Sequence, residues 1–227
     1  MSHHAFTLAD APLHALPSGA LHWPERHLLI LSDLHLGKSE RLARRGGSLL
    51  PPYETRATLG KIDADLGLTG AGAVICLGDS FDDPTAATRL DEADRQWLAR
   101  LMAGRDWTWI SGNHDPGPHG LAGGQRDSLT LDRVTFRHMA TQDTPEISGH
   151  YHPKARLAGR ARPCFLIDRG RVILPAYGAY TGGLWCDDPV LVSLMQPAAL
   201  AVLTGTTARA IPMPTARAPA RMPRASR

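Results

Sequence analysis

The stretch LLILSDLHLG, residues 28–37, joins a short apolar run directly to a polar motif. The run LLIL (28–31) has the length of a buried strand, and Asp33 and His35 follow where that strand would end and a loop would begin. Because alternate residues of an extended chain face the same way, these two side chains would project to one side. The stretch therefore predicts a strand that carries a carboxylate and an imidazole to one point at a sheet edge.

Further apolar runs outside this stretch predict buried strands, at 73–77, 107–110, 164–167 and 172–174. Between the strands, leucine and isoleucine recur at helical spacing and predict helices over 53–68 and 90–102. Strands alternating with helices indicate an α/β protein. The segments 145–149 and 190–195 also resemble strands, which favours a second, more antiparallel sheet packed on the first.

The chain divides into one catalytic domain, expected at 1–205, and a tail, 206–227, expected to be disordered. No acidic residue follows Asp188, and the tail is rich in Pro, Ala and Arg without an apolar period. At 227 residues the chain is long enough for one well-buried domain. Residues 1–20 do not resemble a secretory signal, and no apolar run approaches the roughly 20 residues that cross a bilayer. We therefore expect a soluble cytoplasmic protein.

The cysteines argue against two kinds of site. Cys76, Cys164 and Cys186 are an odd number and show no C-x-x-C spacing. Neither a disulfide framework nor a thiolate zinc site is indicated.

Three more polar motifs follow predicted strands or short apolar pieces: GDSFDD (78–83), GNHD (112–115) and GHYHP (149–153). Histidine, aspartate and asparagine together favour borderline transition metals, Mn first and Fe or Zn next, over Ca or a lone Mg. With Asp33 and Asp79 as the only anionic ligands, two divalent ions would keep a surplus of about two positive charges, which suits an anionic phosphate. Spacing alone leaves open whether each pair of ligands holds one ion or straddles two.

Each motif has an ordinary structural explanation when it is taken alone. Gly-Asp before a helix is commonly a cap, and GNHD suits a turn. Asp83 followed by Pro84 predicts that a helix begins just past the second motif. Four such motifs in this order, each where a strand ends, favour a metal site over coincidence.

The four motifs together resemble the pattern of the metallophosphoesterase (calcineurin-like) superfamily over residues 32 to about 153. The resemblance implies a four-layer α/β/β/α sandwich of two mixed sheets flanked by helices. It also implies two metal sites that share one carboxylate. The first would be formed by Asp33, His35, Asp79 and His152, and the second by Asp79, Asn113, one further histidine and His150.

The further histidine is either His119 or His138. His138 follows the short β-like stretch TFR, as the superfamily pattern expects, whereas His119 lies in the Gly- and Pro-rich segment PGPHGLAGG. We therefore expect His138 to be the ligand and His119 to be a surface loop residue.

Flanking stretches resemble a narrower group, the bacterial DNA-ligase-associated metallophosphoesterases. These stretches are SDLHLGKSERLARRGGSLLPPY (32–53), EISGHYHPKARL (146–157) and ILPAYGAYTGGLW (173–185). The resemblance implies a role in DNA repair with a DNA ligase or helicase partner.

The mechanism expected of such a site is in-line attack on phosphorus by a hydroxide that bridges the two ions. If Asn113 is the ligand in its motif, His114 is free to hydrogen-bond a phosphoryl oxygen or protonate the leaving group. Asp115 would then orient the His114 imidazole. Asp82 has two alternative roles, supporting a metal ligand or capping a helix.

Several residues could contact a substrate. Basic side chains follow the first motif, at Lys38, Arg41, Arg44 and Arg45, and could receive phosphates or form a solvated helix face. Aromatic side chains could stack on bases or simply pack, at Tyr53, Tyr151, Tyr177, Tyr180 and Trp185. Tyr151 is the preferred stacking candidate, because it alternates between His150 and His152. Lys38 and Arg41 are the preferred basic candidates.

The leading functional interpretation is a binuclear-metal phosphodiesterase, with nuclease activity in DNA repair as one form of it. A phosphomonoesterase or small-nucleotide hydrolase is the second interpretation, since substrate choice lies in loops. A DNA-repair adaptor that binds nucleic acid or a ligase is the third. The sequence leaves open the physiological metal, the natural substrate and whether the chain forms a homo-oligomer.

Overall fold

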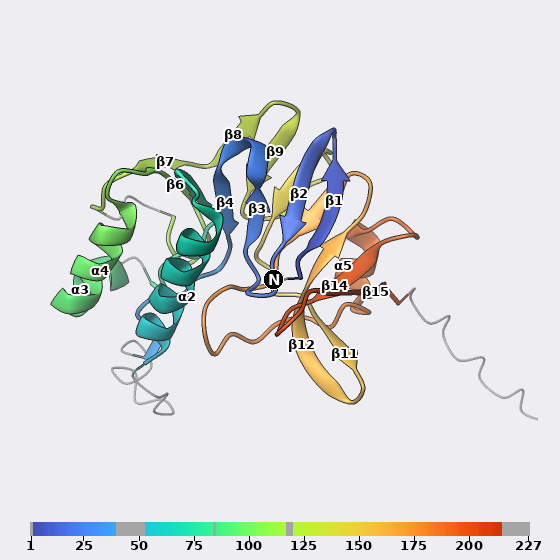
Figure 1. Cartoon of the computed structure of the whole chain (residues 1–227). Helices are drawn as coiled ribbons and strands as arrows, with labels where there is room; N and C mark the ends of the chain where they lie inside the picture. Colours follow the sequence, from blue (N-terminus) through green and yellow to red (C-terminus); the bar gives the residue numbers. More distant parts are fainter. Residues whose placement is uncertain (1, 40–52, 84, 117–119, 215–227) are drawn as a thin grey trace, which may run out of the picture.

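A computed structural model describes residues 2–39, 53–83, 85–116 and 120–214, which form two mixed β-sheets with few helices (Figure 1). The first sheet has the strand order β1-β2-β3-β4-β5-β6-β7. Its strands are β1 (His4–Leu8), β2 (Ala11–Ala15), β3 (Leu21–Trp23), β4 (Leu28–Leu31), β5 (Ala73–Cys76), β6 (Asp106–Ile110) and β7 (Gly124–Arg126). Pairing is antiparallel from β1 to β4 and parallel from β4 to β7.

The second sheet has the order β15-β14-β12-β13-β10-β9-β8, and β11 pairs with β12. Its strands are β8 (Ser128–Leu131), β9 (Val134–Arg137), β10 (Glu146–Ser148), β11 (Lys154–Leu157), β12 (Arg160–Ile167), β13 (Arg171–Ile173), β14 (Leu200–Leu203) and β15 (Arg209–Pro212). Strand β10 lies parallel to both of its neighbours, β9 and β13. The expectation of a second sheet with more antiparallel pairing is confirmed.

Both long helices expected from sequence are present, as α2 (Glu54–Thr69) and α4 (Glu92–Met102). The Asp91 side chain accepts a hydrogen bond from the Ala93 amide and caps α4. Helix α2 ends at Gly70, whose φ of 62° is left-handed, a common helix stop. The described part also contains the short helices η1 (Pro24–Arg26) and α3 (Ala86–Arg89). None of the described helices is long and apolar enough to cross a membrane.

The segment predicted as a strand at 190–195 is instead helix α5 (Pro189–Leu194). The Asp188 side chain accepts a hydrogen bond from the Val190 amide, and Pro189 occupies the first turn. A capping carboxylate with proline next to it is a strong helix start. These two residues override the strand preference of the valines that follow.

The tail expected to begin at 206 is also corrected. Residues Arg209–Pro212 form β15, which pairs with β14 in the register Leu203↔Arg209 to Leu200↔Pro212. The edge of the second sheet provides hydrogen-bond partners for a segment that has little apolar character of its own. Residues 215–227 lie outside the described part.

Three clusters of buried apolar side chains position these elements. One lies between the two sheets and includes Ile30 and Ile75 from the first and Phe136 and Phe165 from the second. Another joins the first sheet to α2 and α4, and a third joins the second sheet to α5. The three cysteines are buried and free, as their spacing predicts.

A buried ion pair holds the strand that leads to the GHYHP motif. Glu146 of β10 is 0% exposed, and its Oε1 lies 2.6 Å from Nε of Arg171 on the adjacent β13. The Thr141 amide donates to the same carboxylate at 3.1 Å. Since the Arg171 guanidinium is itself 4% exposed, neither charge is well hydrated.

We expect Glu146→Gln to lower the free energy of unfolding by about 3 to 5 kcal/mol, because it leaves the buried Arg171 charge uncompensated. Urea denaturation followed by circular dichroism measures this change. The control is Asp132→Asn, which breaks the exposed Arg26–Asp132 pair and should cost about 1 kcal/mol or less. Equal losses in the two variants would contradict this account of β10.

Candidate metal centre

The predicted ligands lie in loops that follow strand ends. Parallel strands β4, β5 and β6 place residues 32–37, 78–83 and 111–115 at one edge of the first sheet. The loop after β10 supplies His150 and His152, and the end of β9 supplies His138. Backbone hydrogen bonds join the first two loops, from the Asp33 amide to the Gly78 carbonyl (3.2 Å) and from the His35 amide to the Asp79 carbonyl (2.9 Å).

The backbone of these loops is not extended, which corrects the geometry assumed from sequence. Asp33, His35, Asp79, His150 and His152 have φ values of 52°, 46°, 46°, 71° and 47°. Left-handed conformations of non-glycine residues cost about 1 to 3 kcal/mol each and cluster at functional sites. Tight turns at the strand ends therefore orient the candidate ligands, and the alternation of side chains along a strand does not.

The first group of candidate ligands is Asp33, His35 and His152. Oδ1 of Asp33 lies 3.1 Å from Nε2 of His152, which in turn lies 3.4 Å from Nε2 of His35. Asp33 is 0% exposed, and this Oδ1 has no hydrogen-bond partner among the described residues. Its other oxygen accepts from the His150 amide at 3.0 Å and from the Ser32 hydroxyl.

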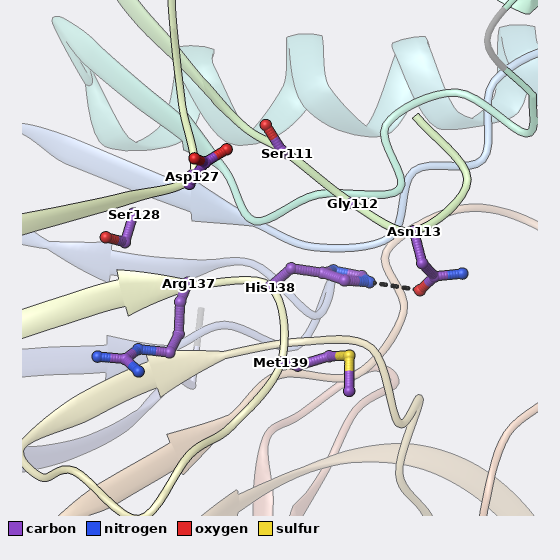
Figure 2. Close-up of a pocket in the computed structure, with 8 residues that line it drawn as sticks. All are labelled: Ser111, Gly112, Asn113, Asp127, Ser128, Arg137, His138 and Met139. Atoms are coloured by element: carbon purple, nitrogen blue, oxygen red, sulfur yellow. Dashed lines mark hydrogen bonds between the residues drawn. The ribbon is translucent and has the colours of Figure 1, made fainter. Parts of the chain in front are cut away.

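The second group is Asp79, His138 and His150, with Asn113 beside it. Nε2 of His138 lies 2.9 Å from Oδ1 of Asn113, 3.1 Å from Nδ1 of His150 and 3.4 Å from Oδ2 of Asp79. Figure 2 shows the His138 ring pointing at the Asn113 side chain. His138 joins this group; His119 lies outside the described residues.

The ligand atoms fit divalent ions in both spacing and chemistry. Metal–ligand bonds of about 2.1 Å place neighbouring ligand atoms roughly 3 to 3.5 Å apart, close to the separations of His152 and His138 from their neighbours, and all the atoms of each group lie within 4.8 Å of one another. Nδ1 of His138 lies 2.8 Å from the Leu77 carbonyl, so that nitrogen is the natural donor. Nε2 is then left as a lone pair among three other lone-pair atoms, an arrangement that a cation would satisfy.

The electrostatics of the site favour cations. Burial alone would raise the pKa of Asp79, but its hydrogen bond and charge interaction with His138 lower that pKa to about 2. The pKa of Asp33 is also lowered, because interactions with His152 and His138 outweigh its burial. Burial lowers the pKa of His138, but Asp79 and Asp33 more than compensate and raise it overall. Carboxylates that draw a proton to His138 would also draw a metal ion there.

Two glycines allow the loops to approach one another. A Cβ on Gly149 would lie 1.7 Å from Oγ of Ser32, and one on Gly112 would lie 2.1 Å from the Asp79 amide nitrogen. Such separations are far inside contact distance. The glycines of GHYHP and GNHD therefore bring the motif loops together and supply no ligands themselves.

The carboxylate of Asp115 accepts hydrogen bonds from backbone amides of two motif loops. It is 0% exposed and accepts hydrogen bonds from the amides of Asp79 (2.9 Å), Ser80 (2.7 Å), Phe81 (3.0 Å) and Gly112 (3.1 Å). Burial raises its pKa to about 6, against the pull of these amides. These hydrogen bonds shape the loop that carries Asp79, and the orientation of His114 by Asp115 stays a prediction.

His114 lies at the open side of the candidate centre. Its side chain is 41% exposed, compared with 7% for His138 and 17% for His152. Nδ1 lies 3.2 Å from the Asp82 carbonyl, and Nε2 lies 4.0 Å from Oδ2 of Asp79. The partly exposed ring is thus held through Nδ1, with Nε2 on the side of the Asp79 carboxylate.

The sequence left two roles open for Asp82, support of a metal ligand and capping of a helix, and the structure places Asp82 and Asp83 differently. Oδ1 of the buried Asp82 lies 3.1 Å from Nδ1 of His35, at ion-pair distance but outside hydrogen-bond angle. Oδ1 of Asp83 accepts from the amide and hydroxyl of Thr85 at the start of α3. Asp82 thus lies beside the candidate ligand His35, and Asp83 organises the helix start.

The structure describes only some of the predicted substrate-binding residues. Nζ of Lys38 donates to the Tyr180 carbonyl at 3.2 Å. Arg41, Arg44 and Arg45 lie outside the described residues. The half-buried Tyr151 packs against the third apolar cluster and lies edge-on to His150, with ring centroids 5.0 Å apart. Packing accounts for this ring, and its contact with a substrate stays a prediction.

Sequence reasoning missed two supports of the site. The Ser32 hydroxyl bonds Asp33, and Tyr177 is fully buried with its hydroxyl 2.8 Å from Asp65 while its amide donates to the Ser32 carbonyl. The position of Ser32 next to a predicted ligand was the available signal. Nothing in the sequence pairs Tyr177 with Asp65.

An open pocket of about 470 Å³ borders the second group of ligands. It is lined by Ser111, Gly112, Asn113, Asp127, Ser128, Arg137, His138 and Met139 (Figure 2). Asn113 and His138 therefore face both the candidate centre and solvent. A substrate in this pocket would reach the second group of ligands directly.

The sequence matches no protein-family model. It also matches no curated protein. The fold does match a solved structure, the crystal structure of the Pseudomonas putida nuclease MPE, with a TM-score of 0.73 and 28% identity. The match covers 92% of this chain and 100% of the nuclease. By fold and site the chain is a two-sheet α/β protein with paired candidate metal groups, similar in structure to a nuclease.

Proposed function

We propose that the chain is a metal-dependent phosphodiesterase that cleaves nucleic acid. The observation that carries this proposal is the presence of two neighbouring groups of candidate ligands, which His138 links. Nδ1 of His138 lies 4.0 Å from Oδ1 of Asp33 while its Nε2 faces Asp79, so the two groups are contiguous. Similarity to a nuclease supports nucleic acid as the substrate.

Two divalent ions are proposed for the centre, with Mn preferred and Fe or Zn as alternatives. His35, His152, His138 and His150 provide nitrogen ligands, and Asp33, Asp79 and Asn113 provide oxygen ligands, a mixture that suits these metals. We further propose the four-layer α/β/β/α arrangement, which the three apolar clusters support. A place in DNA repair beside a ligase rests on the flanking stretches of sequence alone.

The chain's own residues have distinct parts in the proposed reaction. When bound, the ions would lower the pKa of a coordinated water and neutralise charge on the phosphoryl group. Asp79, a member of the second group, is proposed as the carboxylate that both ions share. His114 is the proposed general acid: in its imidazolium form, Nδ1–H donates to the Asp82 carbonyl and Nε2–H is available to protonate the leaving oxygen, which leaves the ring neutral.

Metal removal tests this function. Metal-free protein should hydrolyse no phosphoester, and Mn should restore cleavage of bis(p-nitrophenyl) phosphate and of a fluorescent oligonucleotide. The rate with p-nitrophenyl phosphate, a monoester, provides the comparison. Faster monoester than diester cleavage would favour the phosphomonoesterase. Oligonucleotide binding without hydrolysis under any metal would favour the adaptor.

A further inference from the structure

A basic and aromatic surface adjoins the candidate metal centre. Strand β11 begins two residues after His152 and carries Lys154 and Arg156 on one face. Both cations lie over the indole of Trp185, with Nζ of Lys154 4.7 Å and Cζ of Arg156 4.5 Å from the ring centroid. We call these three side chains the Trp185 platform.

The platform is fixed to the segment that carries the metal ligands. The Lys154 amide donates to the Leu184 carbonyl at 2.9 Å, and the Cys186 amide donates to the Lys154 carbonyl at 2.8 Å. At Gly183 a Cβ would lie 1.9 Å from the His152 carbonyl oxygen, so this chain segment runs directly against the ligand loop. Trp185 therefore has a defined position relative to His152.

The cations of the platform have no ion-pair partner among the described residues. Within the described residues, neither Lys154 nor Arg156 forms an ion pair, whereas Arg56 pairs with Asp94 and Arg26 pairs with Asp132. No acidic residue occurs from 151 to 167. The exposed Asp187 lines the same hollow as Arg156 and Trp185, yet it pairs with neither cation. The surface is thus positively charged and open to an anionic ligand.

The chemistry of the platform suits a single strand of nucleic acid. A guanidinium stacked on an indole keeps its N–H edge free for phosphate, and the ring holds it in place at little cost in side-chain freedom. Cations interleaved with an aromatic ring are typical of surfaces that follow an unpaired strand, because unpaired bases can stack. The β11–β12 hairpin projects from the body of the protein, where a long ligand can reach it (Figure 1).

We propose that the Trp185 platform binds the single-stranded nucleic acid next to the scissile bond. Lys154 and Arg156 contact its phosphates, and Trp185 supports a base. This inference rests on the proposed nuclease function, since it places the platform on the substrate path beside His152. In this proposal the β11–β12 hairpin binds a long substrate, whereas the ions carry out the chemistry.

The test compares Lys154→Gln/Arg156→Gln with a control that removes the same charge, Arg95→Gln/Arg100→Gln, on the surface of α4. Binding of a fluorescent single-stranded oligonucleotide is measured by anisotropy in EDTA, over a range of salt. The platform variant should bind about tenfold more weakly, and the slope of log Kobs against log salt should fall by about 1.4 for two lost phosphate contacts. Hydrolysis of bis(p-nitrophenyl) phosphate, which is too small to span both sites, should stay within about twofold of wild type.

Trp185→Ala should also weaken oligonucleotide binding about tenfold through lost stacking, and Trp185→Phe should recover part of it. Equal binding and equal salt slopes in the platform and α4 variants would overturn the inference. So would wild-type protein that binds poly-glutamate and no oligonucleotide, which would indicate an acidic protein partner. Failure of the nuclease function alone looks different: the platform variant would still lose binding, but no form would hydrolyse a diester.

Discussion

Asp79→Asn is expected to abolish both metal loading and turnover. Asp79 is the carboxylate of the second ligand group, with Oδ2 3.4 Å from Nε2 of His138 and Oδ1 accepting from the His114 amide at 2.8 Å, and we propose that both ions share it. Asparagine keeps the shape and can still accept from His114, but it removes the charge and turns an N–H₂ toward the cations. Since ions supply several kcal/mol of transition-state stabilisation, kcat/KM for a diester should fall roughly a thousandfold or more.

Metal content by mass spectrometry and Mn titration by calorimetry measure the first effect, and bis(p-nitrophenyl) phosphate hydrolysis measures the second. Asp132→Asn is the matched control, because Asp132 is exposed and pairs only with Arg26 among the described ion pairs. It should load two equivalents of metal and turn over normally. Two equivalents of tightly bound Mn in Asp79→Asn would show that Asp79 does not join the two sites.

Several of the candidate ligands could be predicted from sequence because a polar motif that directly follows a strand must lie at the end of that strand. Strands β4, β5 and β6 are parallel, so Asp33, Asp79 and Asn113 had to emerge at one sheet edge. The orientation of the side chains could not be predicted in this way. It depends on left-handed residues such as His35 and on glycines pressed against neighbouring loops, and both are consequences of tertiary contacts.

The segments whose structure was not anticipated share a cause. Strands β1 to β3 are short and mix apolar with polar residues; buried and half-buried residues alternate in Ala11–Ala15, so these strands lack the apolar run that marked the central strands. Arg209–Pro212 is a strand only because β14 offers it an edge. The hydrogen bonds from four backbone amides to the Asp115 carboxylate also depend on how the motif loops meet, which the sequence does not show.

His114→Ala is expected to lower the rate of hydrolysis and leave metal binding intact, whereas Asp79→Asn is expected to lose both. The ring belongs to neither ligand group, and its 41% exposure leaves it able to reach a substrate. Metal content should therefore stay at the wild-type value while kcat falls roughly 10²- to 10⁴-fold, the range for loss of a positioned general acid. The fall should be largest for an oligonucleotide, whose alkoxide leaving group needs a proton, and smallest for a p-nitrophenyl ester.

This dependence on the leaving group distinguishes an acid from a group that only binds phosphate. Loss of a hydrogen bond to a phosphoryl oxygen would slow both substrates alike, whereas loss of the acid would spare the ester with the good leaving group. His3→Ala, in an exposed histidine of the N-terminal segment, provides the control and should change neither metal content nor rate. Near-normal oligonucleotide cleavage by His114→Ala would remove His114 from the mechanism, and the proton for the leaving oxygen would then have to come from solvent.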